Sequence, residues 1–358
     1  MPDAPRRLIV LGGSNSVLRD GWTSHLRERG VAGFEVVNLS LGAATTLMGL
    51  YRLLAADPLR AGDTVVWEYA LNEYNHWRSG VALPVLEHQL RWLLRLCARA
   101  GAGMVPVLMH NRPQFLAPDE DAYLQAVRGQ FAAAGLDPVC CAALLRDRGP
   151  LPDAATLYSD TAHYDTGHAL LCDLAGCVAE RAERGAPVPV VQDAADETLT
   201  LVREFEGRAP VRFVNSLIAC DEYPLTGHLR AEARGQVLGA IVMAAEQAHG
   251  LWFEFGNGVR CGPFGTRVVV PEGKPERVVK QLNVQAACGA RATAAGRVGI
   301  RPLPRLIVQQ TYAAPPGQSR PRQDAIVALV VEGRVAVAAP PPRRNWLRRL
   351  VDRRPTSA

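Results

Sequence analysis

The sequence predicts a three-layer α/β/α domain built on a parallel sheet, followed by an antiparallel β-sandwich-like domain. Strands and helices alternate through the first half of the 358-residue chain, and short strand-like runs replace this pattern further on. A hydrophobic content of 48% is enough to fill two cores. We expect the domains to span residues 1–185 and 186–342, with a basic tail over 343–358.

Four apolar runs rich in β-branched residues are the expected strands of the parallel sheet. They are LIVL (8–11), FEVVNLS (34–40), TVVWEYA (64–70) and MVPVLM (104–109). The apolar spacing predicts helices over about 16–29, 44–56, 85–101, 119–134 and 166–184, the first of them ending at Gly30. Because ligands of open parallel sheets bind at the carboxyl ends of the strands, functional residues are expected there.

Beyond APVPVV (186–191), apolar runs are separated by Gly, Pro and charged turns, which is typical of antiparallel strands in a β-sandwich. The runs are VRFVNSLIA, VLGAIVMAA, LWFEF, TRVVVP, RVVKQLNV, RLIVQQTY and AIVALVVEG. We expect AAPPGQSRPRQ (313–323) to be an exposed loop and PPP (340–342) to end the second domain.

The net charge of +5 is located in the tail RRNWLRRLVDRR, which holds six Arg and one Asp. The rest of the chain is near neutral, so no nucleic-acid partner is expected. The apolar residues of the tail, which are Trp346, Leu347 and Leu350, allow a weak contact with acidic lipid headgroups. A disordered, solvated tail is the favoured interpretation.

Eight cysteines are scattered along the chain without a C-x-x-C pair or a zinc-site spacing, so several are expected to be buried free thiols. Only four apolar residues stand between the first Arg pair and Gly12, which is too short for a signal peptide. Since no apolar run reaches the length of a membrane span, the expected location is the cytoplasm.

The stretch LGGSNSV (11–17) joins the first expected strand to the first helix, and such a turn either binds an anion or exposes a nucleophile. The Lys of a P-loop and the G-x-G-x-x-G of a dinucleotide site are both missing. The elbow G-x-S-x-G is also missing, because Ser16 stands at its second Gly. Ser14 is therefore either a nucleophile outside these classes or a simple helix cap.

A nucleophile also needs a base, an acid that orients the base, and donors to an oxyanion. Candidates follow other expected strands in LSLGA (39–43) and in ALNE (70–73), where a loop is expected. A further candidate block, DTAH (160–163), precedes the last expected helix. Together with GGSN (12–15), these four blocks in this order resemble the SGNH hydrolases, a branch of the GDSL esterase/lipase superfamily. The resemblance covers roughly residues 6–184 and implies an SGNH/flavodoxin-like fold.

The resemblance implies that Ser14 attacks an acyl carbonyl, that His163 takes its proton and that Asp160 orients the imidazole. It also implies that the N–H groups of Ser14 and Gly42 and the side-chain amide of Asn72 receive the oxyanion. The chain departs from the usual family pattern, without losing any of these groups, at Gly13, Ala70, Glu73 and Gly167.

Two rival assignments remain open at this point. Ser16 is a second candidate nucleophile, although a place in the first helix is preferred for it. Asp165 and His168 repeat the D-x-x-H spacing, but Gly167 and the apolar run after it place His168 inside the last helix. The pair Asp160 and His163 is therefore preferred.

Four residues near the expected site are candidate substrate contacts, with a surface or sheet-edge position as the equal alternative. They are Glu73, Tyr74, His110 and Arg112. The aromatic side chains after the Asn block are of the kind that stacks on a sugar ring.

We expect hydrolysis of an ester through an acyl-Ser intermediate, with no metal and no organic cofactor. By analogy with the family, the ester is an acyl group on a carbohydrate, and the β domain holds the glycan. The alternatives are O-acyl transfer to a glycan hydroxyl and a non-catalytic binding or assembly protein that uses the β domain. The acyl group, the alcohol and the oligomeric state are not indicated.

Overall fold

The computed structural model describes ten stretches of the chain. They are residues 5–117, 119–192, 196–206, 208–225, 227–245, 250–256, 258–266, 277–289, 293–302 and 325–334. The expected loop 313–323, the PPP segment, the basic tail, the run RLIVQQTY and most of TRVVVP lie outside these residues.

A five-stranded parallel sheet in the order β2-β1-β3-β4-β5 forms the centre of the first domain, as predicted. Its strands are β1 (Arg6–Gly12), β2 (Phe34–Asn38), β3 (Thr64–Glu68), β4 (Gly103–Leu108) and β5 (Val139–Cys140). β3 and β4 are buried along their whole length, which explains why they read as continuous apolar runs. The two-residue β5 is too short to give a periodic signal and was not predicted.

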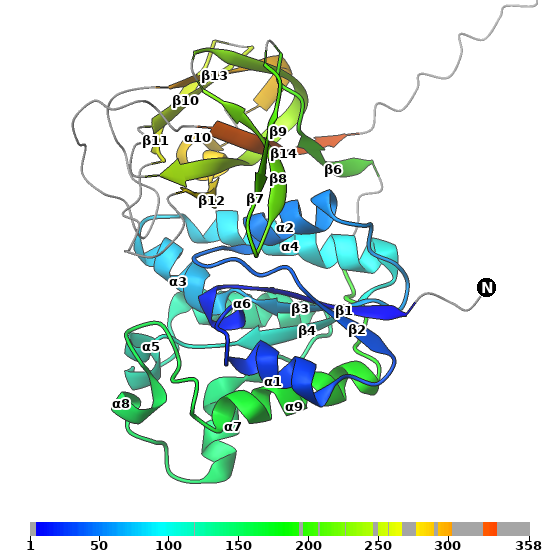
Figure 1. Ribbon diagram of the computed structural model, residues 1–358, viewed down its shortest axis with the longest axis vertical. Coiled ribbons are helices and arrows are strands. Elements are labelled where there is room, and N and C mark those ends of the chain that lie inside the picture. The colour runs from blue at the N-terminus through cyan, green and yellow to red at the C-terminus, as the bar shows by residue number, and fades with distance from the viewer. Residues whose placement is uncertain are drawn as a thin grey trace, which may run out of the picture.

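Helices cover both faces of this sheet (Figure 1). They are α1 (Trp22–Arg29), α2 (Thr46–Ala55), α3 (Ala70–Arg78), α4 (Leu83–Ala100), α5 (Arg112–Leu116), α6 (Ala122–Ala133), α7 (Cys141–Arg148), α8 (Ala154–Leu157) and α9 (Leu170–Glu183). Along β1, Leu8 and Val10 pack with α1, α7 and α9, while Ile9 and Leu11 pack with α2, α4 and α6. The sheet is therefore doubly wound.

The sequence prediction was wrong about the residues around Asn72. A loop was expected, but Asn72 lies in the first turn of α3. The buried residues of α3 include the polar side chains of Asn72, Glu73 and His76, so the helix shows no clear apolar periodicity. The first helix also starts later than expected, because a short 3₁₀ turn (Ser14–Ser16) precedes α1.

The second domain is an antiparallel sheet in the order β11-β10-β13-β9-β14-β8-β7, with β12 on β9 and β6 on β14. The strands are β6 (Glu197–Val202), β7 (Val211–Val214), β8 (Ala219–Pro224), β9 (Leu229–Ala245), β10 (Gly250–Phe255), β11 (Arg260–Gly265), β12 (Arg277–Leu282), β13 (Thr293–Pro302) and β14 (Ala325–Arg334). The 17-residue β9 is central, since it pairs with β13 along its first half and with β12 along its second. The predicted antiparallel class is confirmed.

The runs VRFVNSLIA and RVVKQLNV do not form single strands. The first is the hairpin of β7 and β8, where the Asn215 side chain accepts the N–H groups of Leu217 and Ile218. The second ends in α10 (Val284–Cys288). The Asn residue in each run is the local signal for these breaks.

The antiparallel sheet lies over α2 and α4, on the side away from α1 and α9 (Figure 1). Gly239 of β9 approaches α2 so closely that a Cβ there would stand 2.3 Å from the Leu47 Cδ2 atom. Polar contacts also cross this interface, including Gln89 to Asn283 at 2.8 Å. The two sheets are thus joined through α2 and α4 by a continuous packed layer.

None of the helices among the described residues is long and apolar enough to cross a membrane.

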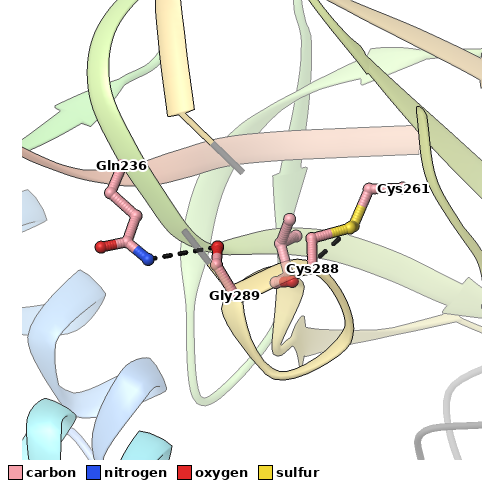
Figure 2. The surroundings of a disulfide bond; sticks show 5 residues. Gln236, Cys261, Cys288 and Gly289 are labelled. Carbon is pink, nitrogen blue, oxygen red and sulfur yellow. Dashed lines mark hydrogen bonds between the residues drawn. A yellow bond between two sulfur atoms is a disulfide. The ribbon is translucent and has the colours of Figure 1, made fainter. Parts of the chain in front are cut away.

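The expectation of several buried free thiols is confirmed at Cys97, Cys140, Cys141 and Cys220, but two other cysteines form a disulfide that was not predicted. Cys261 of β11 and Cys288 of α10 form a disulfide, beside the hydrogen bond from the Gln236 side chain to the Gly289 carbonyl (Figure 2). No short sequence motif indicates this disulfide, because the two cysteines are 27 positions apart in the sequence. Structural disulfides are typical of oxidising compartments. The cytoplasmic location stays a prediction.

We expect the double variant Cys261→Ser and Cys288→Ser to unfold more readily than the wild type. Releasing a loop with a sequence separation of 27 residues raises the entropy of the unfolded chain, at a cost of roughly 3–4 kcal/mol in the chain-entropy estimate. Urea unfolding followed by circular dichroism measures the loss. An unchanged unfolding midpoint, or free thiols at both positions in the oxidised protein, would contradict this expectation.

Candidate active site

Three side chains form a hydrogen-bonded line at the carboxyl end of β1. Ser14 begins the 3₁₀ turn directly after the strand, and its Oγ lies 2.8 Å from the His163 Nε2 atom. The His163 Nδ1 atom lies 2.7 Å from the Asp160 Oδ2 atom. His163 and Asp160 both belong to the segment between α8 and α9, which returns to the strand ends after 145 residues. This is the arrangement that a Ser-His-Asp nucleophile requires.

The local fold of DTAH (160–163) orients the carboxylate of Asp160. Its Oδ1 atom accepts the N–H groups of Ala162 and His163, each at 2.7 Å, which leaves Oδ2 for the imidazole. Burial opposes ionisation of Asp160, but the hydrogen bonds from His163 and the two N–H groups outweigh it and hold the pKa below its ordinary value. The side chains of Asp160 and His163 are 53% and 25% exposed, so these two members of the hydrogen-bonded set are accessible to solvent.

Asn15 connects the nucleophile turn to the segment that carries His163. Its side-chain amide donates to the Ala162 carbonyl at 3.0 Å, and its Oδ1 accepts the Tyr164 N–H at 3.1 Å. Both contacts flank His163, so they fix the imidazole relative to Ser14. The sequence analysis did not select Asn15, although it stands inside the quoted block GGSN.

The Glu68 carboxylate, at the end of β3, binds the turn that carries Ser14. Its Oε2 atom accepts the Gly13 N–H at 3.1 Å and the Ser16 hydroxyl at 2.7 Å. The Ser16 oxygen in turn accepts the Trp22 indole N–H at 3.1 Å. Burial raises the pKa of Glu68 to about 7, although the hydrogen bonds from Ser16 and Gly13 oppose the rise. Glu68 was not predicted, because it lies within an apolar run.

This raised pKa gives stability a defined pH dependence. Between pH 4.5, the ordinary value for glutamate, and about pH 7, the folded protein binds more protons at Glu68 than the unfolded chain does. The contribution of Glu68 to stability is therefore full below pH 4.5 and is lost as the pH rises to about 7.

We expect the free energy of unfolding of Glu68→Gln to fall less with rising pH than that of the wild type, by up to about 3 kcal/mol. The part of the fall that is due to Glu73, whose pKa is raised in the same way, remains. The measurement is urea unfolding of both proteins at several pH values between these limits. Parallel stability–pH curves for the wild type and the variant would show that Glu68 does not titrate in this range.

Gly42 and Asn72 lie beside the nucleophile. A Cβ at Gly42 would stand 3.9 Å from the Ser14 Cβ, so the Gly42 backbone faces Ser14. A Cβ at Gly13 would stand 1.9 Å from the Asn72 Nδ2 atom. The Asn72 amide therefore occupies the space that a side chain at position 13 would need. This close approach leaves no room for a side chain at position 13, in agreement with the Gly found there.

Among solved structures, a two-domain esterase (CEX), described as active on acetylated mannans, matches with a TM-score of 0.58 and 12% sequence identity, over 92% of each chain. The two chains therefore share their fold across both domains. The α/β/α fold implied by the resemblance to SGNH hydrolases is thereby confirmed.

Other solved structures match about half of the chain. The acetylxylan esterase Axe2 from Geobacillus stearothermophilus is 18% identical, with a TM-score of 0.40, over 52% of this chain and 97% of that chain. TesA is 23% identical, with a TM-score of 0.36, over 49% of this chain and 99% of that chain. No protein-family model and no curated protein sequence matches this chain.

The rival residues occupy structural positions. The Ser16 hydroxyl is fully buried between Glu68 and Trp22. Asp165 accepts the N–H of Gly167, and His168 accepts the N–H of Leu170 at the start of α9. His168 therefore precedes α9 by two residues instead of lying inside it, and its role there is to cap the helix.

One of the four candidate substrate contacts, Glu73, is corrected by its burial. Glu73 is fully buried, and its carboxylate accepts the Thr46 N–H at 2.8 Å and the Tyr123 hydroxyl at 3.0 Å. It is a core residue of α3 whose carboxylate binds the first N–H of α2, so it does not reach a substrate. The buried His110 ring lines a cavity of about 210 Å³ with Gln114, Arg128 and Arg146, and its role as a substrate contact stays a prediction.

The other two contacts stay predictions. Tyr74 is partly exposed on α3, with its ring centroid 5.9 Å from that of Trp77. The Arg112 N–H donates to the Thr161 carbonyl at 3.0 Å, so Arg112 supports the segment of His163 through its backbone.

Proposed function

We propose that this protein is a serine esterase that removes acyl groups from a carbohydrate through an acyl-Ser14 intermediate. The observation that carries the proposal is the hydrogen-bonded line Ser14–His163–Asp160 with Gly42 and Asn72 beside it. One loop, DTAH (160–163), supplies both the base and the acid that orients it. An esterase of this class needs such a pair for its two successive proton transfers.

In the first step the Ser14 Oγ attacks the acyl carbonyl carbon while the His163 Nε2 atom takes the hydroxyl proton. The carbonyl oxygen becomes an oxyanion, for which the N–H groups of Ser14 and Gly42 and the Asn72 amide are the proposed donors. Collapse of the tetrahedral intermediate breaks the C–O bond of the ester, and His163 returns its proton to the leaving alkoxide. The products are the free alcohol and acyl-Ser14.

In the second step a water molecule attacks the acyl carbon, and His163 takes the water's proton and passes it to the Ser14 Oγ. Asp160 holds the imidazole in the tautomer with its free lone pair toward Ser14 and stabilises the imidazolium in both steps. The carboxylic acid leaves, and the free enzyme is restored.

The proposed substrate class is an O-acetylated polysaccharide. The supporting observation is that the fold similarity to the esterase described as active on acetylated mannans extends over both domains. The second domain also packs directly on α2 and α4, so a glycan bound to it would remain close to the strand ends.

Acetate released from acetylated mannan, with the deacetylated polymer as the blank, tests this function. We expect acetate release by the wild type and none by Ser14→Ala. Acetate that appears on an added oligosaccharide instead of in solution would identify an acyltransferase. Turnover of long-chain aryl esters without any acetate release from the polymer would contradict the carbohydrate substrate.

A further inference from the structure

The loop between β2 and α2 carries Gly42, and it is held against the first domain at its start. The Leu39 N–H donates to the Val10 carbonyl at 2.9 Å, and the Leu41 N–H donates to the Gly12 carbonyl at 3.1 Å. The residue after Gly42 is Ala43, whose φ of +54° is unfavourable for a side chain with a Cβ. Such a conformation persists only where neighbouring groups hold it.

Part of that support comes from the second domain. The Lys280 ammonium of β12 donates to the Gly42 carbonyl at 2.8 Å. The side-chain amide of the neighbouring Gln281 donates to the Ala43 carbonyl at 3.2 Å. Two successive carbonyls of the loop are therefore held by two successive residues of one strand, 238 positions further along the chain in each case.

His76 of α3 belongs to the same cluster, one turn after Asn72 on the same helix face. Burial lowers the pKa of His76 to about 4, and the nearby Lys280 charge contributes to this shift. Loss of hydration lowers the pKa of Lys280 to about 8. The positive charge of this cluster therefore resides on Lys280 at neutral pH.

We infer that Lys280 is a positioning residue that holds the Gly42 backbone so that its N–H faces the oxyanion. The carbonyl that Lys280 binds belongs to the peptide following Gly42, and the oxyanion donor belongs to the peptide preceding it. Glycine can adopt more backbone conformations about its N–Cα and Cα–C bonds than any other residue, so Gly42 alone does not fix the orientation of the first peptide. Fixing the second peptide removes part of this freedom. The second domain thus completes the active site of the first.

This inference rests on the proposed function, and kinetics of p-nitrophenyl acetate hydrolysis test it. We expect Lys280→Met to lower kcat by about 10- to 100-fold, below the 10²–10³ that loss of a whole oxyanion donor costs. KM should change little, because the lysine acts on the transition state through Gly42. Lys280→Arg keeps a charged donor and should restore most of kcat.

Glu197→Gln is the matched control. It removes another contact between the domains, from Arg95 to Glu197 at 2.6 Å, without touching the loop of Gly42. We expect its kcat to match that of the wild type. A fall in kcat as large as that of Lys280→Met would assign the effect to loosened domain packing and would overturn the inference.

The rate of Ser14 phosphonylation by a fluorophosphonate distinguishes a wrong role for Lys280 from a wrong proposed function. We expect Lys280→Met to react more slowly than the wild type by a factor similar to its loss in kcat. Equal rates and equal kcat in the two proteins would overturn the role of Lys280 and leave the esterase intact. A wild type that neither reacts with the probe nor hydrolyses the ester would refute the proposed function, and the inference with it.

Discussion

Ser14→Ala is expected to lower ester turnover by at least about 10⁴-fold while the fold stays intact. The Ser14 Oγ is the atom that would bond to the acyl carbon, and alanine offers no replacement for it. The hydrogen bond lost is the part-buried one to His163. Removing it costs about 1 kcal/mol or less, so the melting temperature should change by no more than about 2–4 °C.

Steady-state kinetics of acetate release, with a thermal melt of each protein, check this expectation. Ser16→Ala is the matched control, since Ser16 is the rival nucleophile two residues away. Its buried hydroxyl binds Glu68 and Trp22, so the variant should lose stability but keep an active Ser14. Full turnover by Ser14→Ala, or loss of all turnover only in Ser16→Ala at an unchanged melting temperature, would show that Ser14 is the wrong residue.

Asn72→Ala is expected to lower kcat by about 10²–10³-fold with little change in KM. The Asn72 amide lies next to Gly13, beside the nucleophile, where it can donate to the developing oxyanion. An interaction that forms mainly in the transition state affects kcat more than substrate binding. Gly13→Ala should cause a loss of the same kind, because its new Cβ would collide with the Asn72 Nδ2 atom.

Asn75→Ala is the control for Asn72, because Asn75 lies on the same helix with its side chain bonded to Asn111 instead of facing the nucleophile. We expect it to retain nearly all of the wild-type kcat. The two variants and the wild type are compared on one soluble acetyl ester. A loss in Asn72→Ala that appears in KM alone would place Asn72 in substrate binding and not in the oxyanion hole.

The sequence was sufficient for four of the five strands of the first domain because they are mainly apolar runs, of which β3 and β4 are fully buried. Helices with apolar stripes separate these runs. The prediction failed where buried polar groups replace apolar ones. In α3, Asn72, Glu73 and His76 point inward, so the helix reads as a polar loop. The disulfide between Cys261 and Cys288 has no local signal either.

The candidate site was predictable to the extent that its residues lie in short blocks at strand ends. Ser14, Gly42, Asn72, Asp160 and His163 meet those conditions, and the structure brings them together. The supporting residues could not be found in this way, because their partners are distant in the sequence and their own segments are apolar. Examples are Glu68, at the end of a buried strand, and Lys280, on a strand of the other domain.

The central claim is that Ser14 is an activated nucleophile, and the most direct test is the intact mass of the protein after exposure to a fluorophosphonate. The account predicts a single adduct on the wild type, mapped to Ser14 by peptide sequencing, and no adduct on Ser14→Ala. An unmodified wild type, or an adduct that persists in Ser14→Ala, would contradict the account.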